Sequence, residues 1–168
     1  YDGHPHGVEA IVTDYLGNPI DGAEATIKYV EIKNGSEILM DNAPVMPGNY
    51  KAVATYVGQK DTISATATIR IYELSTYVRI SPNLTSVVYD GYPHTVSAEA
   101  YDENHNLIAT STDNPEKVSI KYYSLADEMY VESPIDAGIY HITAEFKGDE
   151  TVYGSSNILG VMVIKPSD

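Results

Sequence analysis

Histidine is the side chain best suited to metal binding in this chain, which has five histidines and no cysteine. His4 and His6 lie two residues apart, and in an extended strand both imidazoles would point to the same side. The second half of the chain has Tyr92 where His4 stands, so the histidine pair is not repeated. We therefore expect no metal site, and we expect His6 and its counterpart His94 to contact nearby turn residues.

Oxygen-bearing side chains occur at alternate positions over residues 102–106 (DENHN), as they do in calcium-binding loops. An EF-hand loop would continue with a glycine and a distal glutamate, whereas Leu107 and Ile108 follow here. The corresponding stretch of the first half, residues 14–18 (DYLGN), has the composition of an ordinary hairpin loop. We predict a turn in both places, not a calcium site.

Known catalytic motifs do not occur in the sequence. We find no serine with a nearby His/Asp signature, no glycine-rich phosphate loop and no helical metal motif. The 24 acidic residues would be enough for a glycosidase pair, but nothing in their distribution singles one out. We predict that the chain is not an enzyme and that it uses no cofactor.

Two lysines, Lys28 and Lys121, recur at the same repeat position between apolar residues. Some Gram-positive sandwich domains crosslink a core lysine to an asparagine or aspartate. Strand alternation instead directs both lysines away from Ile27 and Ile120, toward solvent. We expect free lysines, and an intact mass would show the loss of ammonia or water if a bond formed.

Tyrosine gives the strongest indication of ligand binding, since the chain has 15 Tyr, one Phe and no Trp. An aromatic ring can stack on a sugar and still offer a hydroxyl. The candidate ligand-binding residues are Tyr122, Tyr123, Tyr130 and Tyr153. Tyrosine can also replace phenylalanine in a strand core, and the alignment of Tyr29 with Tyr122 favours the core for that position. Tyr15 and Tyr101 have no assigned role.

The charge of the chain limits its partners. The formal net charge is −14, with a pI near 4.5, and both halves are acidic. Nucleic-acid binding and attraction to an anionic membrane both need a basic surface, which this composition does not supply. No apolar run reaches membrane-spanning length. We expect a monomer that neither inserts into a membrane nor binds nucleic acid.

The chain contains two copies of one unit. It opens YDGHPHGVEA, and residue 89 begins YDGYPHTVSA, with a constant offset of 88. Later, PVMPGNYKAVATYVG from Pro44 matches PIDAGIYHITAEFKG from Pro134. Residues 86–88 read as a short strand that leads into the second YDG, and the first copy has no equivalent. We expect the first copy to lack its N-terminal strand and to belong to a longer array.

Apolar and polar residues alternate with a period of two in many short stretches, which is typical of half-buried strands. The clearest are residues 8–13, 62–72, 96–100, 118–122 and 140–147, separated by turn signals such as Asn34-Gly35 and Gly148-Asp149. Only Ser36–Met40 and Ser124–Met129 could hold a helical turn, and both are too short for a stable helix. This pattern predicts an all-β chain of two antiparallel β-sandwich domains, residues 1–75 and 76–168.

A glycine followed two residues later by tyrosine recurs in both copies, as Gly48 with Tyr50 and Gly138 with Tyr140. It resembles the turn into a late strand of immunoglobulin-like folds, where the tyrosine hydroxyl bonds back across the corner. A core tyrosine after a turn glycine is the alternative.

The YDG-x-PH-x-V opening, the later P-x-x-AG-x-Y and the closing YGSS at residues 153–156 resemble MBG/YDG-type repeats. Those are bacterial immunoglobulin-like repeats of large secreted or cell-wall-attached proteins. The resemblance covers nearly the whole chain, once per half, although residues 57–59 (VGQ) replace the late Tyr-Gly-Ser in the first copy. The repeat motif consists of Tyr1, Asp2, Gly3, Pro5, His6, Tyr89, Asp90, Gly91, Pro93, His94, Gly138 and Tyr140.

The resemblance implies tandem immunoglobulin-like sandwiches at a bacterial cell surface or in the secreted fraction, and it transfers no catalytic residues. We expect an extracellular structural or adhesive module, acting as a spacer or presenting surface beside neighbouring repeats. The alternatives are a module that binds a host or environmental glycan, mucin or protein through exposed tyrosines, and an accessory domain of a secreted polysaccharide hydrolase. A β-grasp unit would need a helix that the sequence does not show.

Overall fold

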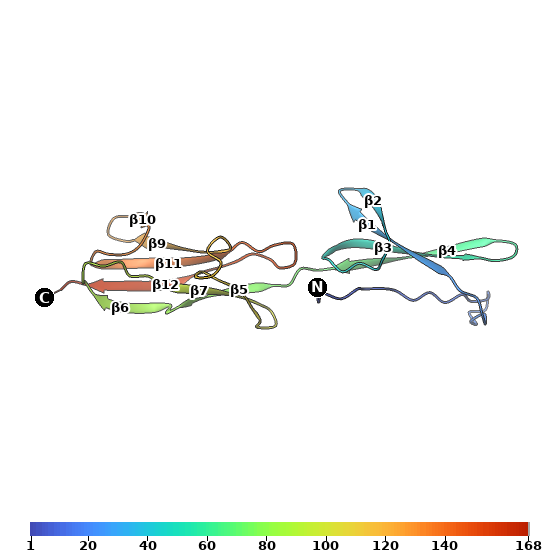
Figure 1. Cartoon of the computed structure of the whole chain (residues 1–168), viewed down its shortest axis with the longest axis horizontal. Helices are drawn as coiled ribbons and strands as arrows, with labels where there is room; N and C mark the ends of the chain where they lie inside the picture. Colours follow the sequence, from blue (N-terminus) through green and yellow to red (C-terminus); the bar gives the residue numbers. More distant parts are fainter. Residues whose placement is uncertain (168) are drawn as a thin grey trace. The chain divides into compact units, whose positions relative to one another are not determined.

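The computed structural model describes residues 1–167, and every regular element in that range is a β-strand. The chain divides into two compact units, Tyr1–Glu73 and Leu74–Asp168 (Figure 1). The fold class is therefore all-β, with mainly antiparallel sheets, as the alternation predicted. Since the described residues form no helix, none of them offers a helical membrane span.

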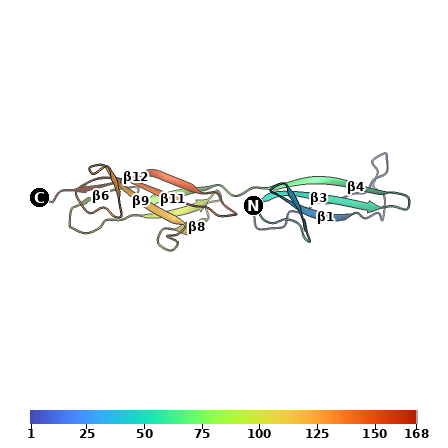
Figure 2. The same ribbon diagram turned by 90° about the horizontal axis from the view of Figure 1, so that it is seen from above.

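The second unit contains two sheets (Figures 1 and 2). Its five-stranded sheet has the order β10-β9-β11-β12-β6, and its three-stranded sheet has the order β5-β7-β8. All neighbouring strands are antiparallel except β6 and β12, which are parallel. The strands are β5 (Thr76–Ser81), β6 (Leu84–Val88), β7 (Ser97–Asp102), β8 (Leu107–Thr110), β9 (Val118–Ser124), β10 (Met129–Val131), β11 (Gly138–Phe146) and β12 (Ser155–Lys165).

The core of the second unit lies between these sheets, because apolar side chains of both form one buried cluster. To this cluster one sheet contributes small residues, such as Ala98 and Ala100 of β7, and the other contributes large ones, such as Ile142 and Phe146 of β11. These four side chains are at most 2% exposed. The strict alternation along β11 explains this arrangement, since every second residue faces the same side of a strand. Burial of such side chains is the main force that stabilises the unit.

The first unit contains one sheet, with the order β2-β1-β3-β4, over residues 1–73. Its strands are β1 (Thr26–Lys33), β2 (Ser36–Met40), β3 (Gly48–Val57) and β4 (Thr62–Ile71). Their pairing corresponds to that of β9, β10, β11 and β12, because Tyr29 lies opposite Ala52 as Tyr122 lies opposite Ile142. In place of a second sheet, this unit has the extended segment before β1.

One predicted strand is absent from the described residues, and one stretch that could have held a helical turn is a strand. Residues 8–13 alternate like a strand but form none, and only an isolated bridge joins Thr13 to Pro19. Their counterpart β7 pairs with β5, whereas the described residues of the first unit offer no strand in that place. Ser36–Met40 is strand β2 and not a helical turn, because it pairs with β1 across the Asn34-Gly35 turn. The strand predicted at residues 86–88 is confirmed as part of β6.

Candidate functional site

The YDG motif forms the same corner in both units. In the first, Asp2 Oδ1 accepts a 2.9 Å hydrogen bond from the amide of His4 and lies 3.0 Å from His6 Nε2. The amide of His4, followed by the charge and ring nitrogen of His6, lowers the pKa of Asp2. The backbone of His6 then donates to the carbonyl of Pro44 at 2.8 Å. The motif therefore closes a turn and ties it to the loop before β3.

The second copy repeats the two backbone contacts of this corner. Asp90 Oδ1 accepts a 2.9 Å hydrogen bond from Tyr92 N and lies 3.2 Å from His94 Nε2, and His94 N donates to Pro134 O at 2.8 Å. Tyr92 contributes its backbone amide in the place of His4, so the contact is independent of the side chain. In both units the histidine ring nitrogen lies close to the turn aspartate, with a hydrogen bond in the first unit, whereas the buried His94 Nε2 of the second has no hydrogen-bond partner among the residues that the structure describes. These motif residues are part of the framework.

The second repeated contact joins the chain after the YDG corner to the sheet. The hydroxyl of Tyr122 accepts a 3.0 Å hydrogen bond from the amide of Val96, and Tyr29 does the same for Val8 at 3.2 Å. Tyr122 is 4% exposed and belongs to the core cluster. The prediction that Tyr122 contacts a ligand is therefore wrong, since its ring lies on the inward face of β9 and is almost fully buried in the core.

The tyrosine that follows each corner glycine is both buried and hydrogen-bonded. Tyr140 donates from its hydroxyl to the carbonyl of Asp136 at 2.9 Å, and Tyr50 donates to Met46 at 2.7 Å. Both rings are at most 4% exposed, and burial raises the pKa of both hydroxyls. The corner hydrogen bond and the core position, given above as alternatives, are both present, because each tyrosine fills the core and also donates a hydrogen bond back across the corner.

The DENHN stretch forms a tight hairpin loop between β7 and β8. Asp102 Oδ1 accepts from the amides of Asn104 and Asn106 at 2.9 Å each, and Oδ2 accepts from Asn106 Nδ2 at 3.0 Å. The Asn106 side chain is the main cause of the lowered pKa of Asp102. Asp14 and Asn18 make the same contacts in the first unit. The turn prediction is confirmed in both units, and the carboxylate oxygens that a cation would need are directed at loop nitrogens.

The remaining tyrosine candidates are on the surface. Tyr123 of β9 and Tyr130 of β10 pack edge to face, with ring centroids 5.2 Å apart, and Tyr130 is 63% exposed. Tyr153, in the loop before β12, is 51% exposed. Tyr123 and Tyr130 are direct partners in the strand register, which brings them together. Of the four predicted residues, these two form one exposed aromatic surface.

A second aromatic group was missed by sequence reasoning. Tyr77 of β5 stacks on Tyr101 of β7 at 5.4 Å between centroids, and its hydroxyl lies 2.9 Å from His105 Nδ1. The sequence did indicate that Tyr77 faces outward, because it alternates with the apolar residues Val78 and Ile80, which point into the core. The pairing of β5 with β7 could not be read from the sequence, and it is this register that places Tyr77 opposite Tyr101.

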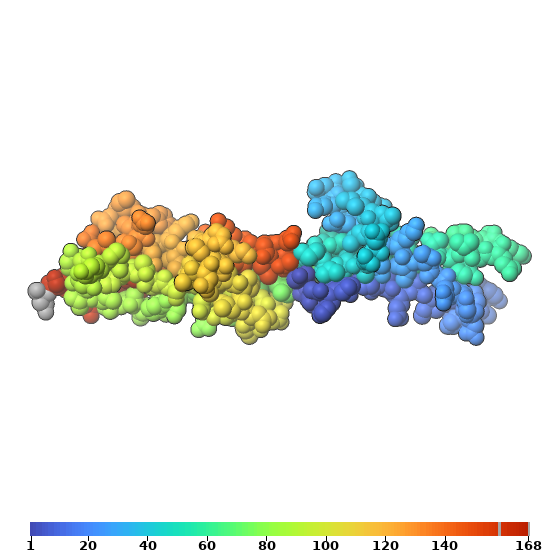
Figure 3. Space-filling view, in the orientation of Figure 1, coloured from blue at the N-terminus to red at the C-terminus, as the bar shows by residue number. Residues whose placement is uncertain are grey.

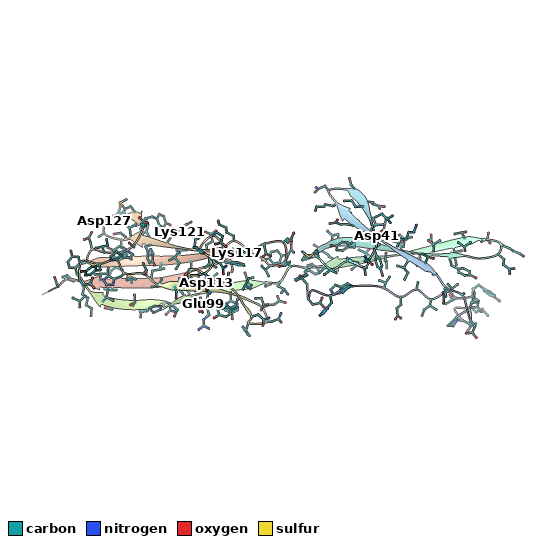
Figure 4. All side chains as sticks on the ribbon, viewed as in Figure 1. Asp41, Glu99, Asp113, Lys117, Lys121 and Asp127 are labelled. Carbon is teal, nitrogen blue, oxygen red and sulfur yellow. The ribbon has the colours of Figure 1, made fainter. Side chains whose placement is uncertain are left out.

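The repeated lysines face solvent, as the alternation predicted. Lys28 is exposed, and the Lys121 side chain is 56% exposed with its Nζ 3.6 Å from Glu145 Oε2 on the neighbouring strand β11. Figure 4 shows Lys121 on the outer side of β9. A lysine in this position is far from the buried environment that an internal crosslink to asparagine or aspartate requires.

In the second unit, β6 forms a parallel ladder with the last strand, β12. Its register runs from Leu84 opposite Val161 to Val88 opposite Lys165. Backbone hydrogen bonds extend the ladder at both ends, since Val161 N donates to Asn83 O and Tyr89 N donates to Lys165 O, each at 2.8 Å. In the first unit the corresponding contact is the 2.8 Å hydrogen bond from the amino group of Tyr1 to the carbonyl of Tyr72.

A groove of about 350 Å³ lies on the inner side of the first unit's sheet. One wall is the segment 8–13, seen in dark blue in Figure 3, and the other is formed by β3 and β4. The apolar lining residues include Val8, Ala10, Val12, Ala52, Ile63, Ala65 and Ala67. The groove contains no charged residue apart from Glu9, so its chemistry is that of an apolar binding surface.

Comparison with protein-family models and with curated proteins finds no match for this chain. The informative comparison is the one between the chain's own two halves. It separates the residues that both units use for the same internal contacts from the features that one unit has alone.

Proposed function

We propose that this chain is a structural repeat module that carries tension, with two immunoglobulin-like units from an extracellular protein of a bacterial surface. The observation that supports the mechanical part is the parallel pairing of β6 with β12. The YDG motif and the recurring Gly-x-Tyr corner support the family and the location by resemblance. In both units these motif residues form internal contacts that hold the framework together.

The direction of the two strands explains why the pairing resists force. Tension applied at the ends of the second unit enters through β5, which precedes β6, and pulls β6 and the end of β12 in opposite directions. Because the strands are parallel, this load runs along both of them and acts on the whole ladder from Leu84 to Lys165 at once. A hairpin pulled from its open end would instead lose its hydrogen bonds one at a time.

Single-molecule pulling tests this function. The chain is held at its two ends and extended, and each unfolding event is assigned by the length of chain that it releases. Full extension gives roughly 250 Å for the first unit and roughly 330 Å for the second, at about 3.5 Å per residue. We expect the longer event to need the higher force, because the strands described for the first unit include no counterpart of the β6–β12 ladder. Equal forces, or a weaker second unit, would argue against a load-bearing role for β6.

A second candidate function is glycan binding through the pair Tyr123 and Tyr130. The observation in its favour is the 63% exposure of Tyr130 beside a second aromatic ring. A glycan array with the unaltered chain and with Tyr130→Ala tests it, and Tyr92→Ala is the matched control because Tyr92 is 71% exposed but belongs to the YDG corner. Glycan binding lost only in Tyr130→Ala would establish a lectin-like module, and silence across the array would reject it.

A further inference from the structure

The two units differ in one large feature, which is the pair of strands in front of the YDG motif. In the second unit, β5 and β6 precede Tyr89 and belong to different sheets. The residues described for the first unit include no counterpart of either strand. After the motif, β1–β4 correspond to β9–β12, and segment 8–13 corresponds to β7, which pairs with β5 in the second unit. The comparison therefore shows what is left uncovered where β5 and β6 have no counterpart.

In the second unit β5 fills the centre of the core. Val78 and Ile80 are 5% and 6% exposed, and β5 pairs with β7 along its length. Ile80 also reaches β12, because its Cδ1 lies 3.0 Å from the position that a Cβ on Gly160 would take. One strand thus closes the space between β7 and the five-stranded sheet.

The groove of the first unit lies in the corresponding place. Its walls, segment 8–13 and strand β4, are the counterparts of β7 and β12. Ala67 of β4 corresponds to Gly160, since it lies opposite Ala52 as Gly160 lies opposite Ile142. Ala67 is exposed, whereas Gly160 is buried beneath Ile80. The first unit therefore exposes the surface that β5 covers in the second.

The edge of β4 is open in the same way. In the second unit the amide of Val161 donates to Asn83 O, at the start of the ladder with β6. Thr68 is the counterpart of Val161, because it pairs with Lys51 as Val161 pairs with His141. The described part of the first unit keeps only the counterpart of the last hydrogen bond of the β6–β12 ladder, since its Tyr1 N donates to Tyr72 O as Tyr89 N donates to Lys165 O in the second unit.

From these correspondences we infer that the groove and the β4 edge of the first unit form a binding site for an extended strand segment with the pattern of β5 and β6. The segment places aliphatic side chains at alternate positions into the groove, opposite Ala10 and Val12. Its backbone pairs with segment 8–13 and then with β4. Recognition through main-chain hydrogen bonds with pockets for alternate side chains is the chemistry of strand addition to a sheet edge. This inference does not depend on the mechanical function.

The position that Arg79 occupies in β5 indicates which residue the binding segment should carry on its outward face. In the second unit Arg79 of β5 lies opposite Glu99 of β7. The counterpart of Glu99 is Ile11, which is 72% exposed. A charged residue opposite Ile11 would lose its partner, whereas an apolar residue would gain a cross-strand contact. The segment that fits the first unit best therefore carries an apolar residue where β5 has arginine.

The test adds a copy of residues 74–88 directly in front of Tyr1 in the full chain, as Val88 directly precedes Tyr89. Three extensions are compared: the unaltered copy, a copy with Arg79→Leu, and a copy with Val78→Asp and Ile80→Asp that cannot fill the groove. Amide hydrogen exchange of Thr68 and of residues 8–13 reports strand pairing, and the thermal midpoint of the first unit reports stabilisation.

We expect the unaltered copy to slow exchange at Thr68 by about tenfold or more and to raise the thermal midpoint, with the doubly substituted copy doing neither. The Arg79→Leu copy should give the highest midpoint, and a lower midpoint than the unaltered copy would overturn the apolar preference. Exchange at Thr68 that is equal in all three extended chains would overturn the site. Protection of Thr68 that rises with concentration in the unextended chain would also overturn it, because a second copy would then occupy the edge.

Discussion

The hydroxyl of Tyr122 accepts a 3.0 Å hydrogen bond from the amide of Val96, and this contact anchors the chain after the YDG corner to the face of β9. Tyr29 and Val8 repeat it in the first unit. Phenylalanine would fill the same space without accepting the bond. The contact gives a structural reason for tyrosine at this core position in a chain with 15 Tyr and one Phe.

Tyr122→Phe should lower the free energy of unfolding of the second unit by about 1–2 kcal/mol, because the part-buried amide of Val96 loses its acceptor. Urea unfolding of the full chain measures this. Tyr123→Phe is the matched control, since Tyr123 lies on the outer face of the same strand, and a surface change of this kind should stay within about 0.5 kcal/mol. Equal losses of unfolding free energy in the two variants would show that the hydrogen bond to Val96 does not stabilise the unit.

Stability should fall at low pH through the aspartates that close the hairpin loops. The pKa of Asp102 lies below the ordinary value of 3.8, chiefly because the Asn106 side chain bonds its carboxylate. A lowered pKa stabilises the fold above the unfolded value, and the stabilisation is lost as pH falls from about 4 through the folded value. The thermal midpoint of Asp102→Asn should therefore lie furthest below that of the unaltered chain at neutral pH.

The difference between Asp102→Asn and the unaltered chain should shrink as the buffer is taken from pH 7 to pH 2.5. Asp14→Asn provides the same comparison in the first unit, where bonds from Asn18 lower the pKa of Asp14. A gap that stays constant or widens in acid would contradict the assignment of these carboxylates as loop-closing groups.

Ile142 and Gly160 form a size-matched pair, since a Cβ on Gly160 would lie 2.8 Å from Ile142 Cβ. The first unit has Ala52 opposite Ala67 in the same places, so two small side chains replace one large side chain and a glycine. Gly160→Ala should cost about 1–3 kcal/mol by overpacking, and Ile142→Ala about 2–5 kcal/mol by leaving a cavity. The double variant should cost less than the sum, by at least about 0.5 kcal/mol. Strict additivity in urea unfolding would show that the two residues do not share this space.

Alternation identified most strands because side-chain direction has a period of two wherever one face is buried. It failed at residues 8–13, where the pattern is clean but the pairing strand is not among the described residues of that unit. Pairing is a non-local property, and it also decided the Tyr77–Tyr101 stack and the parallel β6–β12 ladder. The buried position of Tyr122, by contrast, was already indicated by its alignment with Tyr29. The groove depends on the same non-local packing, because segment 8–13 and strand β4, which line it, are far apart in the sequence.

The most direct test of the mechanical proposal changes one backbone donor in β6. Tyr89 N donates to β12, so alternate amides before it, including that of Val87, face the same strand. Val87→Pro removes such a donor, whereas Ser86→Pro changes an amide on the open edge, where proline is tolerated. We predict that pulling unfolds the second unit of Val87→Pro at a clearly lower force, with Ser86→Pro close to the unaltered chain. Unchanged force in Val87→Pro would contradict a load-bearing β6–β12 ladder.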